Sequence, residues 1–173
     1  MSDRTLQPWP RFDLVPVSGA DLPPPWAERY PTLHVPGEAA VCRYRSVALR
    51  LVTLSDGREL LQFGEHPFTA LCLDPADGQV VDLVVRTGGA IVRGPRLVNS
   101  SLEQYVATVR EATARFPFDD GSGEDLDYDR AADSLRAHLR PIDPAAWEID
   151  GHWDSFYWDI TMGDWASYLF QQP

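Results

Sequence analysis

The chain has 173 residues, of which 44% are apolar, so it can bury one core of domain size and global disorder is not expected. Its 26 acidic residues against 15 basic ones give a formal net charge of −11, which argues against nucleic acid or an anionic membrane as the direct partner. No stretch approaches the roughly 18 uncharged apolar residues of a membrane helix. The charged, proline-rich first thirty residues also lack the apolar region of a signal peptide. We therefore expect a single cytoplasmic domain over residues 1–173 with a partner that is basic.

The negative charge is concentrated in the last third of the chain. Residues 1–118 hold 12 arginines and 13 acidic residues, whereas residues 119–173 hold 3 arginines and 13 acidic residues, a net charge of −10. The densest segment contains Asp119, Asp120, Glu124, Asp125, Asp127 and Asp129. Such a run is most often a solvated loop and helix start. A partner-binding surface is the alternative, and the sequence leaves both open.

Residues 1–36 hold eight of the 15 prolines, which excludes long helices and central strands there. A short helix is predicted to begin at the prolines and to run through Trp26–Tyr30, because proline suits a first helical turn. The aromatic side chains of Trp9, Phe12, Trp26 and Tyr30 indicate that this segment is an ordered wrap packed on the core.

Strands are predicted from residue 47 to residue 98. Val47–Leu54 and Glu59–Phe63 flank Asp56-Gly57, a strong hairpin signal. A two-residue loop would place one set of side chains on one face of the hairpin and a second set on the other. The first set is Leu49, Leu51, Thr53, Leu60 and Gln62; the second is Val52, Leu54, Leu61 and Phe63. Both faces are largely apolar, so we expect both to be covered.

A second hairpin is predicted from Phe68–Leu73 and Gln79–Val85. Pro75 suits the second position of a type I turn, and Gly78 can adopt the left-handed conformation that closes the loop. Short strands over residues 90–92 and 96–98 would extend the sheet. The result is a sheet of about five to six strands, antiparallel or mixed.

Helical periodicity dominates residues 100–163. A helix over 101–115 is predicted behind a capping box of Ser100 and Glu103. A second is predicted over 124–140, where Pro141 ends it, and a third around Trp153 ends at Gly163. Strands followed by helices indicate an α+β fold with helices packed on the sheet.

No motif for catalysis or cofactor binding stands out. None of the four histidines has a metal-ligand spacing to another histidine or cysteine, and we expect the closest approach, His152-x-Asp154, to lie on the surface. No phosphate loop or nucleophile elbow is present. Cys42 and Cys72 are interpreted as buried free thiols. We therefore expect no metal, no cofactor and no enzymatic activity.

Trp158 is the exception among the aromatic residues near the C-terminus. Most of these side chains are expected in the core. Trp158 lies off the apolar face that Trp153, Phe156, Tyr157 and Ile160 share at helical spacing, which makes it a candidate for contact with a partner.

The order of several short motifs resembles the SUKH superfamily of bacterial immunity proteins, most closely its fourth subfamily. The resemblance covers about residues 31–165. It rests on Asp56-Gly57, Leu60–Gly64, Leu71–Asp74, Gly78–Asp82, Leu97–Tyr105, Ile142–Ala146 and the Trp153 helix that ends at Gly163.

The resemblance implies an α+β fold and a non-catalytic protein that binds and neutralises a polymorphic toxin, often a nuclease or deaminase, encoded beside it. It implies a scaffold role for the backbone of Gly64 and Gly78 and a capping role for Ser100 and Glu103. Binding surfaces differ between members, so no contact residue carries over. A scaffold or regulatory module and an unrecognised small enzyme remain as alternatives. We expect a monomer or weak dimer.

Overall fold

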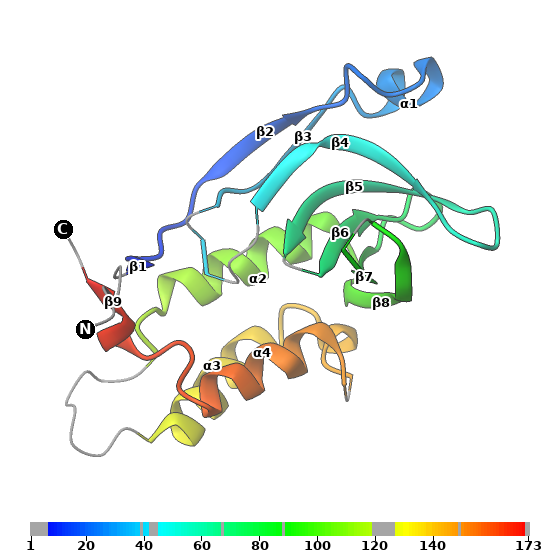
Figure 1. The fold of residues 1–173 in the computed structure, drawn as a ribbon. Coiled ribbons are helices and arrows are strands. Elements are labelled where there is room, and N and C mark those ends of the chain that lie inside the picture. Colours follow the sequence, from blue (N-terminus) through cyan, green and yellow to red (C-terminus); the bar gives the residue numbers. More distant parts are fainter. Residues whose placement is uncertain are drawn as a thin grey trace.

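The computed structural model describes residues 7–38, 40–41, 45–66, 68–87, 89–118, 127–148 and 150–171. These residues form an α+β fold in which three longer helices lie on one side of a five-stranded antiparallel sheet (Figure 1). The strands follow their chain order: β4 (Arg45–Thr53), β5 (Glu59–His66), β6 (Thr69–Leu73), β7 (Val80–Val85) and β8 (Ile91–Asn99). The helices are α2 (Leu102–Ala114), α3 (Tyr128–Leu139) and α4 (His152–Thr161). The predicted fold class is confirmed.

The register of the β4–β5 hairpin differs from the prediction by one residue. The backbone N–H of Leu54 donates to the carbonyl of Arg58 at 2.8 Å, so the loop has three residues rather than two. Gly57 occupies the left-handed region with φ +85°, and the Asp56 carboxylate accepts from the N–H of Arg58 at 3.0 Å. This is a type I turn closed by a glycine bulge.

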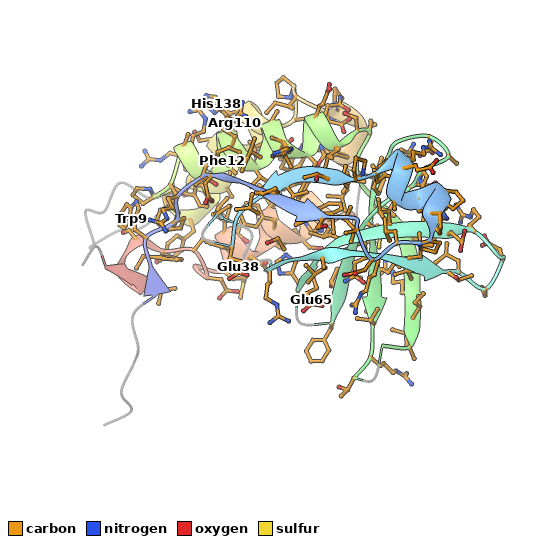
Figure 2. All side chains as sticks on the ribbon, turned by 90° about the horizontal axis from the view of Figure 1, so that it is seen from above. Trp9, Phe12, Glu38, Glu65, Arg110 and His138 are labelled. Carbon is orange, nitrogen blue, oxygen red and sulfur yellow. The ribbon has the colours of Figure 1, made fainter. Side chains whose placement is uncertain are left out.

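The shift of one residue moves the β5 side chains to the opposite faces relative to those of β4. Leu49, Leu61 and Phe63 face the helices, whereas Leu54 and Leu60 lie on the opposite, outer face. Both faces are nevertheless buried, as expected. The sheet is strongly twisted: in Figure 2 the cyan strand β4 runs across the view while the green strands run down it. On the outer face, side chains of neighbouring strands therefore pack on one another and form a second, smaller buried cluster.

The second hairpin forms as predicted. Gly78 has φ +80°, and its N–H donates to the carbonyl of Asp74 at 2.8 Å. The two short strands expected over 90–92 and 96–98 are one strand, β8, whose pairing with β7 shifts register three times. The shifts let the strand bend where we had expected it to break.

The helix boundaries are corrected at two caps. Ser101, not Ser100, caps α2, since its hydroxyl oxygen accepts from the N–H of Gln104 at 3.1 Å. Helix α3 begins at Tyr128 with Asp127 as its cap, whereas residues 124–126 of the predicted helix lie outside the described residues. Helix α4 matches the prediction, and Gly163 follows it with φ +80°.

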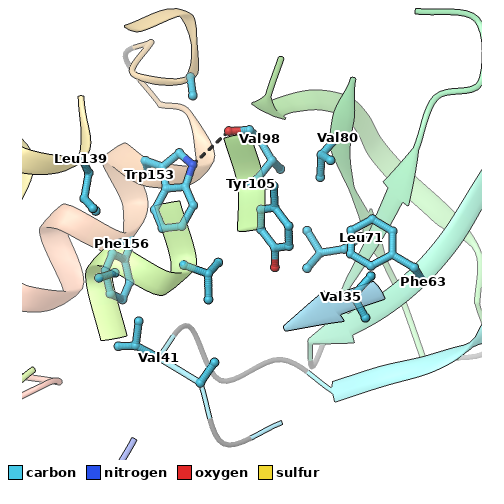
Figure 3. Close-up of a cluster of buried hydrophobic side chains, with 14 of the residues drawn as sticks. Val35, Val41, Phe63, Leu71, Val80, Val98, Tyr105, Leu139, Trp153 and Phe156 are labelled. Carbon is cyan, nitrogen blue, oxygen red and sulfur yellow. Dashed lines mark hydrogen bonds between the residues drawn. The ribbon is translucent and has the colours of Figure 1, made fainter. Parts of the chain in front are cut away.

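Ser100 does not cap α2. It belongs to a joint between segments that are distant in the sequence. Its hydroxyl donates to the buried carboxylate of Asp143 at 2.9 Å, and the side-chain amide of Asn99 donates to the same carboxylate at 3.1 Å. The indole N–H of Trp153 donates to the carbonyl of Val98 at 2.9 Å, shown as a dashed line in Figure 3. These bonds fix the start of α4 against the end of β8.

The N-terminal segment wraps the core as expected. It contains β1 (Gln7–Pro8), β2 (Leu14–Ser18), the short helix α1 (Pro24–Arg29) and β3 (Thr32–Pro36). Trp9, Phe12, Trp26 and Tyr30 are partly buried against the main hydrophobic core. The Arg110 guanidinium of α2 lies 5.0 Å from the centre of the Phe12 ring, and Figure 2 shows the two side by side.

The C-terminal end of the described chain returns to the N-terminal end. After η1 (Pro144–Ala146) and α4, a short turn, η2 (Ser167–Leu169), leads into β9 (Phe170–Gln171), which pairs in parallel with β1. Phe170 and Trp165 are buried in the main core, their rings stacked 5.8 Å apart between centroids.

Candidate functional site

A buried carboxylate in β7 lies beside a polar hollow of the described structure. Asp82 lies in β7 between apolar neighbours and is 0% exposed. Its two oxygens accept from the Arg96 guanidinium of β8, Oδ1 from Nε at 3.0 Å and Oδ2 from Nη2 at 2.6 Å. Oδ2 also accepts from Nδ1 of His152 at 3.0 Å. An ionised carboxylate only accepts, so Nδ1 of this histidine carries the proton.

The electrostatics keep this group charged. Burial alone would raise the pKa of Asp82, but the hydrogen bonds from His152 and Arg96 outweigh it and hold the pKa below its ordinary value. The same ion pair raises the pKa of Arg96. Arg96 also donates from Nη1 to the carbonyl of Asp150 at 2.9 Å. The cluster therefore ties two strands to the start of α4.

A pocket of about 240 Å³ opens beside this cluster, between the sheet and α4. We call it the polar pocket. Besides Asp82, Arg96 and His152, it is lined by His66 and Thr69 from the ends of β5 and β6, by Ser155, Phe156 and Asp159 of α4, and by Asp164 and Trp165. Asp159 and Asp164 are exposed. Three carboxylates against one guanidinium give this pocket negative charge.

A second hollow, of about 330 Å³, lies on the outer face of the sheet. We call it the outer pocket. Its apolar lining comes from Leu51, Val52, Ala70, Leu83, Val85 and Ile91, and its polar lining from Arg50, Gln62 and Glu65. The guanidinium of Arg50 donates to Gln62 at 2.8 Å and lies 3.6 Å from Glu65. His66 and Thr69 line this pocket as well as the polar one.

Phe68 stands at the turn between the two pockets. Its side chain is 66% exposed, and its backbone has φ +68°, the left-handed region that few non-glycine residues adopt. Its carbonyl accepts from the N–H of Val85 at 2.8 Å, and Val85 pairs with Ile91, which is also exposed. An apolar patch therefore surrounds the turn.

The residues singled out in the sequence are only partly brought together. Asp119, Asp120, Glu124 and Asp125 lie outside the described residues. Asp127 caps α3 by accepting from the N–H of Arg130 at 2.9 Å, and Asp129 is exposed in the first turn of that helix. Trp158 is 59% exposed on α4 and projects away from the core, as expected from its position off the apolar face.

Sequence reasoning missed the polar pocket and Phe68. His152 is not on the surface: its side chain is 13% exposed and turns toward Asp82, while Asp154 accepts from the N–H of Asp150 at 3.1 Å. One signal was present, because Asp82 interrupts an apolar strand, Val80–Val85, and a charge in such a place needs a partner. Its partners are 14 and 70 residues away, where no local pattern reveals them.

The remaining predictions concern cysteines, metals and membranes. Cys72 is a buried free thiol, and burial raises its pKa to about 12; Cys42 lies outside the described residues. Among the described side chains, no group of three or more histidine, cysteine or acidic residues could hold a metal ion. Within the same residues, no helix has the length and apolar character needed to span a membrane.

Comparison with known proteins gives one match. The model of the family described as SUKH-4 immunity protein matches residues 16–159. No curated protein and no solved structure matches the chain significantly. The matched segment runs from β2 to α4 and includes the five-stranded sheet and its three covering helices. Because the match covers most of the 173 residues, the chain belongs to the SUKH-4 immunity protein family.

Proposed function

We propose that this protein is a cytoplasmic immunity protein that binds one cognate toxin of a polymorphic toxin system and neutralises it by occluding its active surface. The observation that carries the proposal is the family match over residues 16–159. The charge supports a partner with a basic surface, because a toxin that acts on nucleic acid must present cations to phosphates. A chain of net charge −11 is attracted to that surface.

Acidic residues on the helical layer would steer the encounter. Asp129 and Asp133 of α3 and Asp159 of α4 are exposed, and they belong to the segment 119–173 with its net charge of −10. They form the surface that we assign to long-range attraction. Attraction of this kind raises the association rate more than it slows dissociation.

A histidine held by a buried carboxylate occurs in many hydrolases. An enzymatic function is therefore the alternative against which we compare the contacts of the site. Two contacts of the described structure oppose it. Arg96 occupies the same carboxylate through two hydrogen bonds, and the hydroxyl of Ser155 donates to the carbonyl of Gly151 at 3.0 Å. Among the described contacts of the polar pocket, no serine is hydrogen-bonded to His152. A binding role therefore agrees better with its geometry.

Co-expression tests the proposal. The toxin domain encoded beside this gene is expressed in a bacterial host with this protein, with an unrelated acidic protein, or alone. We expect growth only with this protein, and a complex of the two chains on purification. Growth arrest in the presence of both chains would refute the immunity role. A stable complex with a neighbour that is not toxic would instead favour a scaffold or regulatory role.

A further inference from the structure

We propose that the toxin is gripped at the β5–β6 turn, where Phe68 inserts into the toxin while the toxin places one basic side chain in the polar pocket and one apolar side chain in the outer pocket. This inference rests on the proposed function, since it names the surface that performs it. The occupant is a segment of the cognate toxin in which a lysine or arginine stands close to a leucine, isoleucine, methionine or phenylalanine.

The sizes of the pockets favour single side chains. Sites for small molecules usually enclose about 300–1,000 Å³. The polar pocket, of about 240 Å³, is smaller than that range, and the outer pocket, of about 330 Å³, lies at its lower end. Hollows of this size on an interaction surface receive anchor residues of a protein partner.

The position of the pockets lets one partner fill both. His66 and Thr69 pair with each other across β5 and β6, and each lines both pockets. The two hollows are therefore separated by no more than the end of one strand pair. A partner that covers the turn reaches the helical side and the outer side of the sheet at the same time.

The chemistry of the two pockets differs. In the polar pocket, Arg96 is held by Asp82 and by the carbonyl of Asp150. The exposed carboxylates of Asp159 and Asp164 also line it, and this negative charge favours a cation. In the outer pocket, Val85 and Ile91 supply apolar surface, and the backbone N–H of Val85 donates to the carbonyl of Phe68, whose ring is exposed. A basic residue beside an apolar one matches this pair of environments.

The left-handed backbone conformation of Phe68 indicates that its ring has a role in binding. A left-handed conformation is unfavourable for a residue with a β-carbon, although asparagine and aspartate adopt it more readily. The chain nevertheless places a large apolar side chain there and leaves it 66% exposed. Strained backbone of this kind clusters at functional sites, and large side chains that enter a partner's pockets carry most of the binding energy of an interface.

This backbone also makes a clean test possible. Phe68→Asp removes the ring at a position where aspartate suits the backbone, so we expect the variant to remain folded. Trp158→Asp is the matched control, because it removes another exposed aromatic residue, on α4. Asp159→Arg and Asp129→Arg form a second pair: both change the net charge equally, but only Asp159 lines the polar pocket.

Binding of each variant to the purified, catalytically inactivated toxin domain encoded beside this gene is measured by surface plasmon resonance, with a melting curve for each. We expect Phe68→Asp to raise the Kd about thirty-fold or more and Trp158→Asp to change it less than about three-fold. Asp159→Arg should speed dissociation even in 1 M salt, which screens long-range steering, whereas Asp129→Arg should then match the parent. Parent-like binding by Phe68→Asp would overturn the inference, and a loss in Trp158→Asp alone would move the site to α4.

A second arm separates the inference from the proposed function. A library of random twelve-residue peptides is displayed on phage and selected on the parent protein. Enrichment of peptides with a basic residue next to an apolar one, whose binding is lost in Phe68→Asp, supports the surface even if the toxin domain does not bind. In that case the immunity role fails and the binding surface stands. Peptides that bind Phe68→Asp as well as the parent, or no enrichment, would count against the surface.

Discussion

Replacement of Asp82 by asparagine should lower the free energy of unfolding, because the substitution removes the charge of a buried ion pair. The carboxylate is buried and accepts hydrogen bonds from Nε and Nη2 of Arg96 and from Nδ1 of His152. Removal of one partner of a buried ion pair costs about 3–5 kcal/mol. Because the Arg96 side chain is 23% exposed and keeps its bond to Asp150, the lower end applies. We expect Asp82→Asn to lower the free energy of unfolding by about 3 kcal/mol.

The loss of stability in Asp82→Asn should also depend on pH. The pKa of Asp82 is lower in the folded protein than its ordinary value, which is about 3.9 in an unfolded chain. A depressed pKa stabilises the fold above the unfolded value, and this contribution is lost as the pH falls through the folded value. The difference in stability between the parent and Asp82→Asn should therefore be constant from pH 7 to about pH 5 and shrink below about pH 4.

Urea unfolding followed by tryptophan fluorescence, at a series of pH values, measures this difference. All other ionisable groups are common to the two proteins, so contributions that do not depend on Asp82 cancel in the comparison. Glu59→Gln, on an exposed side chain of β5, is the control and should change stability by less than about 0.5 kcal/mol. A loss below that limit in Asp82→Asn, or a difference that persists undiminished at pH 2, would refute the reasoning.

Four further expectations follow from single features. Gly57 has φ +85° with no atom within 4 Å of an added β-carbon, so Gly57→Ala should cost about 1 kcal/mol through the backbone alone and Gly57→Asn less, as thermal unfolding can check. Cys72 is buried with a pKa raised to about 12, so peptide mapping after iodoacetamide treatment at pH 8 should find it unmodified in the folded protein and modified in urea; labelling at equal rates would contradict its burial. The association rate with the toxin domain should fall about ten-fold or more between low and high salt, and a rate that ignores salt would remove the steering role of the acidic segment. Reduction should leave the Tm unchanged, and a fall of several degrees would indicate a disulfide.

The elements were largely predictable because local patterns encode them. The period of Trp153, Phe156 and Ile160 identified α4, and Gly78 identified its turn. Loop length was not predictable to one residue, since the Asp56 carboxylate accepts from the N–H of Arg58 and turns a two-residue loop into a three-residue one. That single residue changed which face of β5 lies beside which face of β4.

Most of the candidate site could not be predicted from the sequence, for a different reason. Asp82, Arg96 and His152 meet only after β7, β8 and α4 have packed, and nothing local in their neighbourhoods records the encounter. Phe68 was read as the first residue of a strand, because phenylalanine favours strands and its left-handed backbone is visible only in the structure. Trp158 could be placed, since helical spacing alone decides which face it occupies.

The order of the strands in the main sheet has a consequence for how the chain acquires its structure. Each of the strands β4 to β8 pairs with its neighbour in sequence, so the sheet closes only short loops, and low contact order favours rapid folding. The bonds from Asn99 to Asp143 and from Trp153 to Val98 span 44 and 55 residues. They close long loops, and we infer that they form after the rate-limiting step. Substitutions at this joint should thus act mainly on the unfolding rate, so the joint governs how long the native protein persists more than how quickly it forms.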